Sequence, residues 1–263
     1  MFPDPWRLGP LSISFYGFMV AAGVLAALIL FSWTAPRRQL SASACRDFCF
    51  WMVLAGLLGS RIFYVIFHWP EFAGQPSAML AYWRGGLMFQ GGVLGALLLS
   101  PIFLKRYALP FWPTADVMAP SLALGQAFGR LGCLGAGCCY GGPAAPGHPL
   151  ALIFPPGSLA PAGQPLWATQ LMESAGLFSL TLLLFLIIRS NLRFFCRPGR
   201  LAALYLMCAG LLRLLMEFFR GDFRGEALAF GLPPTTLTAL AAAVCGLILL
   251  VFRRPAGRVG PAV

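Results

Sequence analysis

The chain has 263 residues, of which 59% are hydrophobic and only 10% are charged, and its formal net charge is +11. A protein of this composition cannot present a polar surface to water on all sides, which excludes an ordinary water-soluble globular protein. The basic balance does not indicate nucleic-acid binding either, because the chain has no basic domain with interleaved aromatic side chains.

Long uncharged runs divide the chain into candidate membrane-spanning helices, each of which needs about 20 mostly apolar residues. In chain order the candidates are Leu11–Trp33, Phe48–Phe67, Leu87–Leu104, Val117–Leu134, Leu166–Ile188, Leu201–Phe219 and Leu237–Phe252. The first is too long for the apolar region of a signal peptide and follows no basic stretch. We therefore predict an all-α, polytopic membrane protein: a seven-helix transmembrane bundle that forms one domain over residues 1–263, with an outer loop at about 141–165.

The basic residues between these runs predict an orientation. With the amino terminus outside and the carboxyl terminus in the cytoplasm, twelve basic residues fall on the inner side and four on the outer side. The inner ones are Arg37, Arg38, Arg46, Lys105, Arg106, Arg189, Arg193, Arg197, Arg200, Arg253, Arg254 and Arg258, and the outer ones are Arg7, Arg84, Arg220 and Arg224. Topology and contact with anionic inner-leaflet lipids thus explain most of the net charge.

Five ionisable residues remain within the predicted spans, and the predicted topology puts all of them in the outer half: Arg61, Arg130, Glu173, Arg213 and Glu217. A charge within a span costs about 2.5–3.5 kcal/mol on insertion scales, so such a group is typical of a functional site. Arg213 and Glu217 are spaced i, i+4 and could simply neutralise each other. The set still predicts a surplus positive charge, because three arginines meet two carboxylates.

A surplus guanidinium in an apolar cavity of the outer leaflet indicates a phosphate carried by a lipid. The planar guanidinium donates paired hydrogen bonds to phosphate oxygens and stays charged when desolvated. We expect Arg130 to face this phosphate. The glycines that follow it, between Gly132 and Gly142, could let backbone amides approach the headgroup, or could serve close helix packing.

Six sequence blocks occur in order along nearly the whole chain. They are SFYGFMVAAGVLAA from Ser14, LLGSRIFYVIF at Leu57–Phe67, GGLMFQGGVLGA at Gly85–Ala96, FGRLGCLGAGCCYG at Phe128–Gly141, ATQLMES at Ala168–Ser174 and LLRLLMEFFRG at Leu211–Gly221. Their order and spacing resemble the bacterial prolipoprotein diacylglyceryl transferases. The resemblance implies a seven-helix, multi-pass enzyme of the bacterial inner membrane. Such an enzyme moves the diacylglyceryl group of phosphatidylglycerol to the lipobox cysteine thiol of a preprolipoprotein, forming a thioether and releasing glycerol phosphate.

The resemblance also implies partners and site residues. The partners are phosphatidylglycerol, the signal peptide that carries the lipobox cysteine, and membrane lipids; no cofactor is expected. Arg130 matches the arginine of the family's G-R-x-G-N block, and Arg213 matches its second essential arginine. The predicted catalytic residues are Arg130, Arg213, Glu173 and Glu217. The predicted phospholipid-binding residues are Arg130, Arg213, Tyr16, Arg61, Gln90, Gly91, Gly92 and Gly141.

Several positions depart from the family pattern. Gln90 stands where the family usually has a histidine, the usual candidate for the base that activates the thiol, and glutamine cannot accept a proton. Elsewhere Cys133 replaces an asparagine, Cys138 an acidic residue, Trp167 a histidine and Ala209 an essential tyrosine. Desolvated carboxylates can act as general bases, so Glu173 and Glu217 become candidates for this role.

The departures leave other functions open. Cys133, Cys138 and Cys139 could form a redox centre or a soft-metal site. We expect them instead to be small wall residues of the cavity beside Arg130, because no C-x-x-C motif accompanies them, and we assign no metal site from the sequence. The alternatives to the transferase are therefore a membrane thiol-redox protein, or a divergent paralogue that binds anionic phospholipid without turnover or uses another acceptor.

Overall fold

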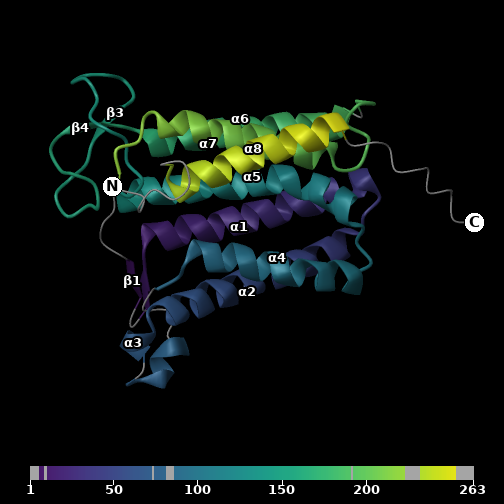
Figure 1. The fold of residues 1–263 in the computed structure, drawn as a ribbon, viewed down its shortest axis with the longest axis horizontal. Coiled ribbons are helices and arrows are strands. Elements are labelled where there is room, and N and C mark those ends of the chain that lie inside the picture. The colour runs from purple at the N-terminus through teal and green to yellow at the C-terminus, as the bar shows by residue number, and fades with distance from the viewer. Residues whose placement is uncertain are drawn as a thin grey trace, which may run out of the picture.

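The structure is a computed structural model that describes residues 6–8, 11–72, 74–80, 86–190, 192–222 and 232–252. Long helices lie side by side along its longest axis (Figure 1). Those with 18 residues or more are α1 (Phe15–Thr34), α2 (Ala42–Phe67), α4 (Phe89–Arg106), α5 (Phe111–Ala136), α6 (Thr169–Ser190), α7 (Arg200–Glu217) and α8 (Pro234–Phe252). Each of the seven predicted runs overlaps one of these helices.

Not every long helix is equally apolar. Four helical segments have the length and hydropathy needed to cross a membrane: Phe15–Arg38, Ala42–Phe67, Thr169–Ser190 and Pro234–Phe252. The protein is thus mostly helical with at least four candidate membrane spans. Seven crossings and the direction of the termini remain predictions, and the predicted orientation rests in part on residues outside the described ones. These are Arg84, Arg224, Arg253, Arg254 and Arg258.

The first predicted span began too early. Trp6–Leu8 (β1) pairs antiparallel with Leu11–Ile13 (β2), so Leu11 lies in a strand. Helix α1 begins at Phe15 because Ser14 adopts an extended backbone and its Oγ accepts a hydrogen bond from the Gly17 amide at 3.1 Å. A serine in this position satisfies an amide that the first turn of a helix leaves unpaired. The serine cap, rather than the start of the apolar run, therefore decides where the helix begins.

Helix α5 lies at the centre of the bundle. It contacts α1 on one side and α6 and α7 on the other, while α2 pairs with α4 and α7 pairs with α8. The core contains Phe31, Phe48, Val117, Leu184 and Leu201, all nearly or fully buried. Many large apolar side chains of the outer helices are exposed instead. Exposed apolar surface of this extent is typical of a protein that faces lipid.

The segment between α5 and α6 covers one end of the bundle (Figure 1). Ala151–Ile153 (β3) pairs antiparallel with Pro165–Trp167 (β4), and the predicted outer loop at about 141–165 falls here. The shorter elements are the 3-10 helices η1 (Ala35–Arg38) and η2 (Pro76–Leu80) and the four-residue α3 (Trp69–Phe72). We call the end with β3 and β4 the site end, because α5 and α7 both finish there.

Candidate functional site

Glu173 of α6 lies between two arginines from neighbouring helices. Its Oε1 is 2.9 Å from Nη2 of Arg130 in α5, and its Oε2 is 3.7 Å from Nη1 of Arg213 in α7. The Glu173 side chain is 7% exposed, whereas those of Arg130 and Arg213 are 22% and 16% exposed. One carboxylate thus sets the spacing of two guanidiniums that water can still reach. Because a guanidinium has several N–H donors in a fixed fork, a second anion can bind the same pair.

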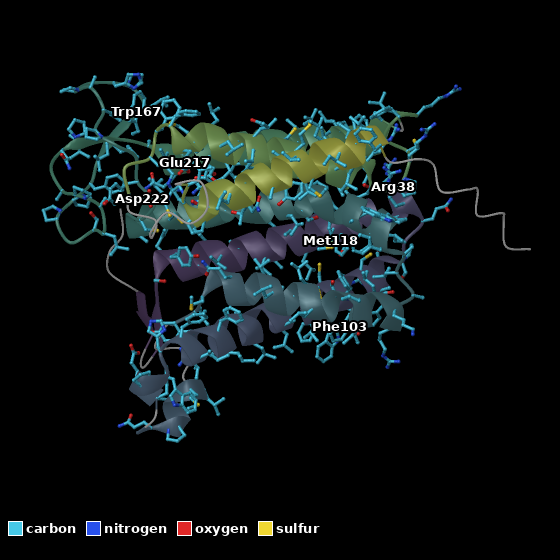
Figure 2. The ribbon with its side chains drawn as sticks, in the orientation of Figure 1. Arg38, Phe103, Met118, Trp167, Glu217 and Asp222 are labelled. Atoms are coloured by element: carbon cyan, nitrogen blue, oxygen red, sulfur yellow. The ribbon has the colours of Figure 1, made fainter. Side chains whose placement is uncertain are left out.

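The predicted pairing of Arg213 with Glu217 is confirmed, but it is one link of a larger network. Arg213 Nη2 is 4.0 Å from Glu217 Oε2, and Thr236 Oγ1 of α8 donates a hydrogen bond of 2.9 Å to Glu217 Oε1. Glu217 lies at the same end of the molecule as Trp167 and Asp222 (Figure 2). The network therefore joins α5, α6, α7 and α8 at the site end.

Arg220 forms a separate ion pair at the same end with Asp222, a carboxylate that the sequence analysis missed. Its Nε and Nη2 donate to the two oxygens of Asp222 at 2.9 and 2.7 Å. Burial disfavours the charge, but the hydrogen bonds with Asp222 and with the Cys139 thiol raise the pKa of Arg220, so it stays charged. In the sequence, this pair is marked only by its spacing: Asp222 follows Arg220 by two residues, shortly after the end of α7.

The predicted surplus of positive charge is not found in this network. The prediction counted Arg61, but the structure places that guanidinium elsewhere. Arg61 donates to the backbone carbonyls of Met79, Gly86 and Ala78 at 2.8–2.9 Å, and so ties down the chain that follows α2. Among the described residues, the ion pairs around Glu173, Glu217 and Asp222 match three carboxylates with three arginines: Arg130, Arg213 and Arg220.

Three cysteine sulfurs meet beside the arginines. The Sγ atoms of Cys133, Cys138 and Cys139 all lie within 4.8 Å of one another, and all three residues are partly buried. Hydrogen bonds with Cys133 and Cys138, together with the Arg220 guanidinium, lower the pKa of Cys139. The sequence analysis named these three cysteines as candidate redox or metal ligands, and the structure brings their sulfurs together.

The turn that carries the cysteines is held from α6. Thr169 Oγ1 donates to the Cys139 carbonyl at 2.9 Å, and Gln170 Nε2 donates to the Cys138 carbonyl at 2.8 Å. Helix α5 ends at Ala136 and is capped by Gly137, which has the left-handed φ of 71° that favours glycine, and Cys139 also has a positive φ of 60°. A non-glycine residue in this region is sustained only when its surroundings impose it. The predicted end of the helix near Leu134 is thus correct to within two residues.

Tyr16 and Gly141 are the other predicted site residues that lie at this end. Tyr16 of α1 is 45% exposed, packs beside Gly132 and interacts electrostatically with Arg130 and the cysteines. Gly141 forms a bridge with Arg220, and a Cβ added to it would lie 2.4 Å from the Trp167 Cβ. Only glycine therefore permits this approach of the loop to the end of α7.

Gln90, Gly91 and Gly92 belong to a helix contact. A Cβ on Gly91 would lie 2.5 Å from the Gly59 carbonyl oxygen, and one on Gly92 would lie 3.2 Å from that of Gly56. These glycines let α4 approach α2 closely, as small residues do in membrane helices. Gln90 is exposed at the start of α4. Phospholipid binding by these three residues and by Arg61 stays a prediction.

His148, in the loop before β3, is partly buried. Its ring packs edge-on against Trp167 with the centroids 4.6 Å apart, and its Nδ1 accepts a hydrogen bond from the Leu150 amide at 3.1 Å. These contacts give His148 a role in shaping the loop before β3. The chemistry of the site end is therefore that of arginines, carboxylates and thiols.

Comparisons with known proteins agree with the sequence blocks. A family model described as prolipoprotein diacylglyceryl transferase matches residues 3–252. The chain is 34% identical over 216 residues to phosphatidylglycerol–prolipoprotein diacylglyceryl transferase 2 of Clostridium perfringens, covering 82% of each chain. It is 33% identical over 249 residues to the phosphatidylglycerol–prolipoprotein diacylglyceryl transferase of Gloeobacter violaceus, covering 92% of this chain and 89% of the relative. The protein of that name from Bacillus velezensis is 30% identical over 258 residues, covering 97% and 93%.

Proposed function

The chain belongs to the prolipoprotein diacylglyceryl transferase family, and from this premise we propose that it moves the diacylglyceryl group of phosphatidylglycerol to the lipobox cysteine thiol of a prolipoprotein. It is thus a transferase of lipoprotein biosynthesis. The observation that carries the proposal is the family match over residues 3–252, which includes both arginines that Glu173 holds together.

We assign the phosphate of phosphatidylglycerol to Arg130 and Arg213. Both guanidiniums are partly exposed, and both belong to helices that finish at the site end. When the bond between the glyceryl carbon and the phosphate oxygen breaks, negative charge grows on the leaving phosphate. Donors already in place around that charge stabilise the transition state more than the ground state. Glu173 is then the residue that keeps the two donors at one spacing.

The acceptor is a thiol, whose thiolate form is the nucleophile. Of the two predicted carboxylate bases, Glu217 is the better placed. The Glu217–Arg213 ion pair is 4.0 Å long, whereas Glu173 is 2.9 Å from Arg130. The interaction of Glu217 with its arginine is therefore the weaker of the two. Tyr16 and Gly141 line the same end and are proposed to contact the lipid.

The proposed setting is the bacterial inner membrane, with seven crossings, the amino terminus outside and the site end toward the outer leaflet. Four apolar helical segments and the exposed apolar side chains support a membrane location. A signal peptide still attached to its prolipoprotein reaches this depth together with the lipid, so both substrates can meet at the site end.

Two experiments test the function. The gene should restore growth and lipoprotein maturation in a strain depleted of its own transferase. The purified protein should transfer the diacylglyceryl group of phosphatidylglycerol to a lipobox peptide, but not to the same peptide with serine in place of the lipobox cysteine. Stable protein that binds phosphatidylglycerol yet fails both assays would support the lipid-binding paralogue instead.

A further inference from the structure

We propose that Cys133, Cys138 and Cys139 bind one zinc ion whose open fourth position holds the lipobox thiol of the substrate as a thiolate. The inference deepens the proposed transfer function and rests on it. It starts from the meeting of three soft ligands and an arginine pair at one end of the bundle. The family resemblance also implies that Gln90 of α4 replaces a histidine that could accept a proton.

The sulfurs are close to the spacing that one ion requires. Zinc–sulfur bonds are about 2.3 Å long, so three sulfurs on a tetrahedral zinc stand about 3.8 Å apart. The three Sγ atoms here lie within 4.8 Å of one another. A contraction of about 1 Å at most is needed, which side-chain rotation of three cysteines can provide.

The cysteine turn is held in place by side chains that are themselves buried. Thr169 and Gln170, each 1% exposed, bind the carbonyls of Cys139 and Cys138. Among the described residues, the Gln170 Oε1 is buried without a hydrogen-bond partner. A buried polar atom of this kind is uncommon and is typical of a functional site. Residues that position a ligand set in this way are what a metal site needs.

The ligand set favours an open zinc site. Structural zinc sites are closed by four protein ligands, whereas catalytic sites have three and keep one position for water or substrate. In the part of the chain that the structure describes, the cluster contains three cysteines and no histidine, aspartate or glutamate. Cuprous ion is the other soft ion that three thiolates would accept, but a trigonal cuprous site would leave no position for the substrate.

Nearby arginines favour the charge of such a site. Three thiolates and one zinc ion together carry one negative charge, and the substrate thiolate adds another. Arg220 contacts the Cys139 thiol, and Arg130 interacts electrostatically with Cys133 and Cys139. Arg130 and Cys133 are also spaced i, i+3 on α5, so they lie on one face of the helix. The proposed phosphate site and the proposed zinc site are therefore adjacent.

The zinc would supply what Gln90 cannot. A thiol that coordinates zinc loses its proton outright, and the proton passes to water. The bound sulfur then attacks the glyceryl carbon that carries the phosphate: a carbon–sulfur bond forms, the carbon–oxygen bond breaks, and its electron pair leaves with glycerol phosphate. The thioether product is neutral and a weaker ligand, so it leaves the zinc. No redox change occurs at any step.

The test uses the full-length protein in detergent, reduced, stripped of metal with a chelator and reloaded with Zn²⁺ or Co²⁺. We expect one zinc per chain, and a cobalt form with tetrahedral and thiolate-to-cobalt absorption bands. A lipobox peptide should strengthen the thiolate band, while its serine counterpart should not. Cys133→Ser, Cys138→Ser and Cys139→Ser should each lose stoichiometric metal, whereas Cys245→Ser, at an exposed position in α8, should keep it.

Activity gives a second measurement. Metal removal should lower transfer by about 10²-fold or more, the usual contribution of a general base, and zinc should restore it. Any of three results would overturn the proposal. These are full transfer by metal-free protein, binding of Cu⁺ but neither Zn²⁺ nor Co²⁺, and a cobalt spectrum that does not change when the peptide is added. A peptide-dependent spectrum in a protein without transfer in any form would uphold zinc–thiol binding and reject the proposed function instead.

Discussion

Two buried carboxylates at opposite ends of the bundle show how the same group serves two purposes. Asp116 of α5, at 0% exposure, accepts hydrogen bonds from the Gly199 and Ala202 amides at 2.7 and 2.9 Å, and Arg38 lies 3.8 Å away. In the described part of the chain, the ion-pair partners of Glu173, at the site end, are the side chains of Arg130 and Arg213. Figure 2 shows Arg38 far from Glu217, at the other end of the molecule.

The difference lies in what each carboxylate is bound to. Main-chain amides at the start of α7 cannot leave Asp116 unless the helix moves, and the positive end of the helix dipole adds to the attraction. Arginine side chains can turn toward a new anion without disturbing any helix. A carboxylate held by backbone therefore stabilises the fold, whereas one held by partly exposed side chains can take part in binding.

The largest expected effect is on stability at the Asp116 end. Asp116→Ala leaves two buried amides without their acceptor and removes the ion-pair partner of Arg38, so we expect a loss of about 3–5 kcal/mol, the range for breaking a buried ion pair. Thermal unfolding in detergent measures it, with Asp47→Ala as the control because Asp47 is exposed. A melting temperature equal to that of the parent would show that this carboxylate is not structural.

At the site end the expected effect is on binding. Arg130→Gln and Arg213→Gln should each weaken phosphatidylglycerol binding by about 1.5–3 kcal/mol, which is about 10- to 150-fold. Stability should fall less than in Asp116→Ala, because each single variant leaves Glu173 its other arginine partner. Lipid co-purification and a melting curve separate the two effects. Arg46→Gln, at an exposed position in α2, is the control. Parent-like lipid binding by both folded site variants would remove the phosphate assignment.

Arg61 is buried, unlike Arg130 and Arg213, and tests whether an arginine of this end holds the fold or binds the lipid. Its guanidinium serves three backbone carbonyls, and a lysine cannot reproduce that fork. Arg61→Lys should therefore cost about 1–2 kcal/mol of stability while lipid affinity stays within about threefold. If the variant is as stable as the parent but binds phosphatidylglycerol weakly, Arg61 belongs to the lipid site, as the family resemblance implies.

The smallest expected effect is a gain. Gly129 precedes Arg130 in α5, and a Cβ added there would meet nothing within 4 Å. Gly129→Ala should raise stability by about 0.5–1 kcal/mol by restricting the unfolded chain, with no change in lipid affinity. Gly91→Ala is the matched contrast, because its Cβ would lie 2.4 Å from the Phe63 Cβ and must destabilise. Weaker lipid binding by Gly129→Ala would mean that the lipid fills the open space beside Gly129.

The sequence by itself determined the helices and the local pairing of Arg213 with Glu217. Apolar runs separated by basic or proline-rich segments leave few other structures, so each predicted run overlaps a long helix. The i, i+4 spacing of Arg213 and Glu217 also survives in any α-helix. Both features are local, and local geometry follows from helical periodicity. The predicted start of α1 was wrong because the cap that Ser14 provides decides where the helix begins.

Only the tertiary structure decided which charges meet. Arg61, Arg130 and Arg213 look alike as arginines within apolar runs, yet Arg61 binds carbonyls of the chain after α2 while the other two share Glu173. Asp222 and the three-cysteine cluster likewise depend on how the turn after α5 meets the ends of α6 and α7. Contacts between helices depend on rotation and depth along each axis, and small residues such as Gly59 and Gly91 set these through packing. The hydropathy of the sequence therefore does not predict how each helix is rotated about its axis.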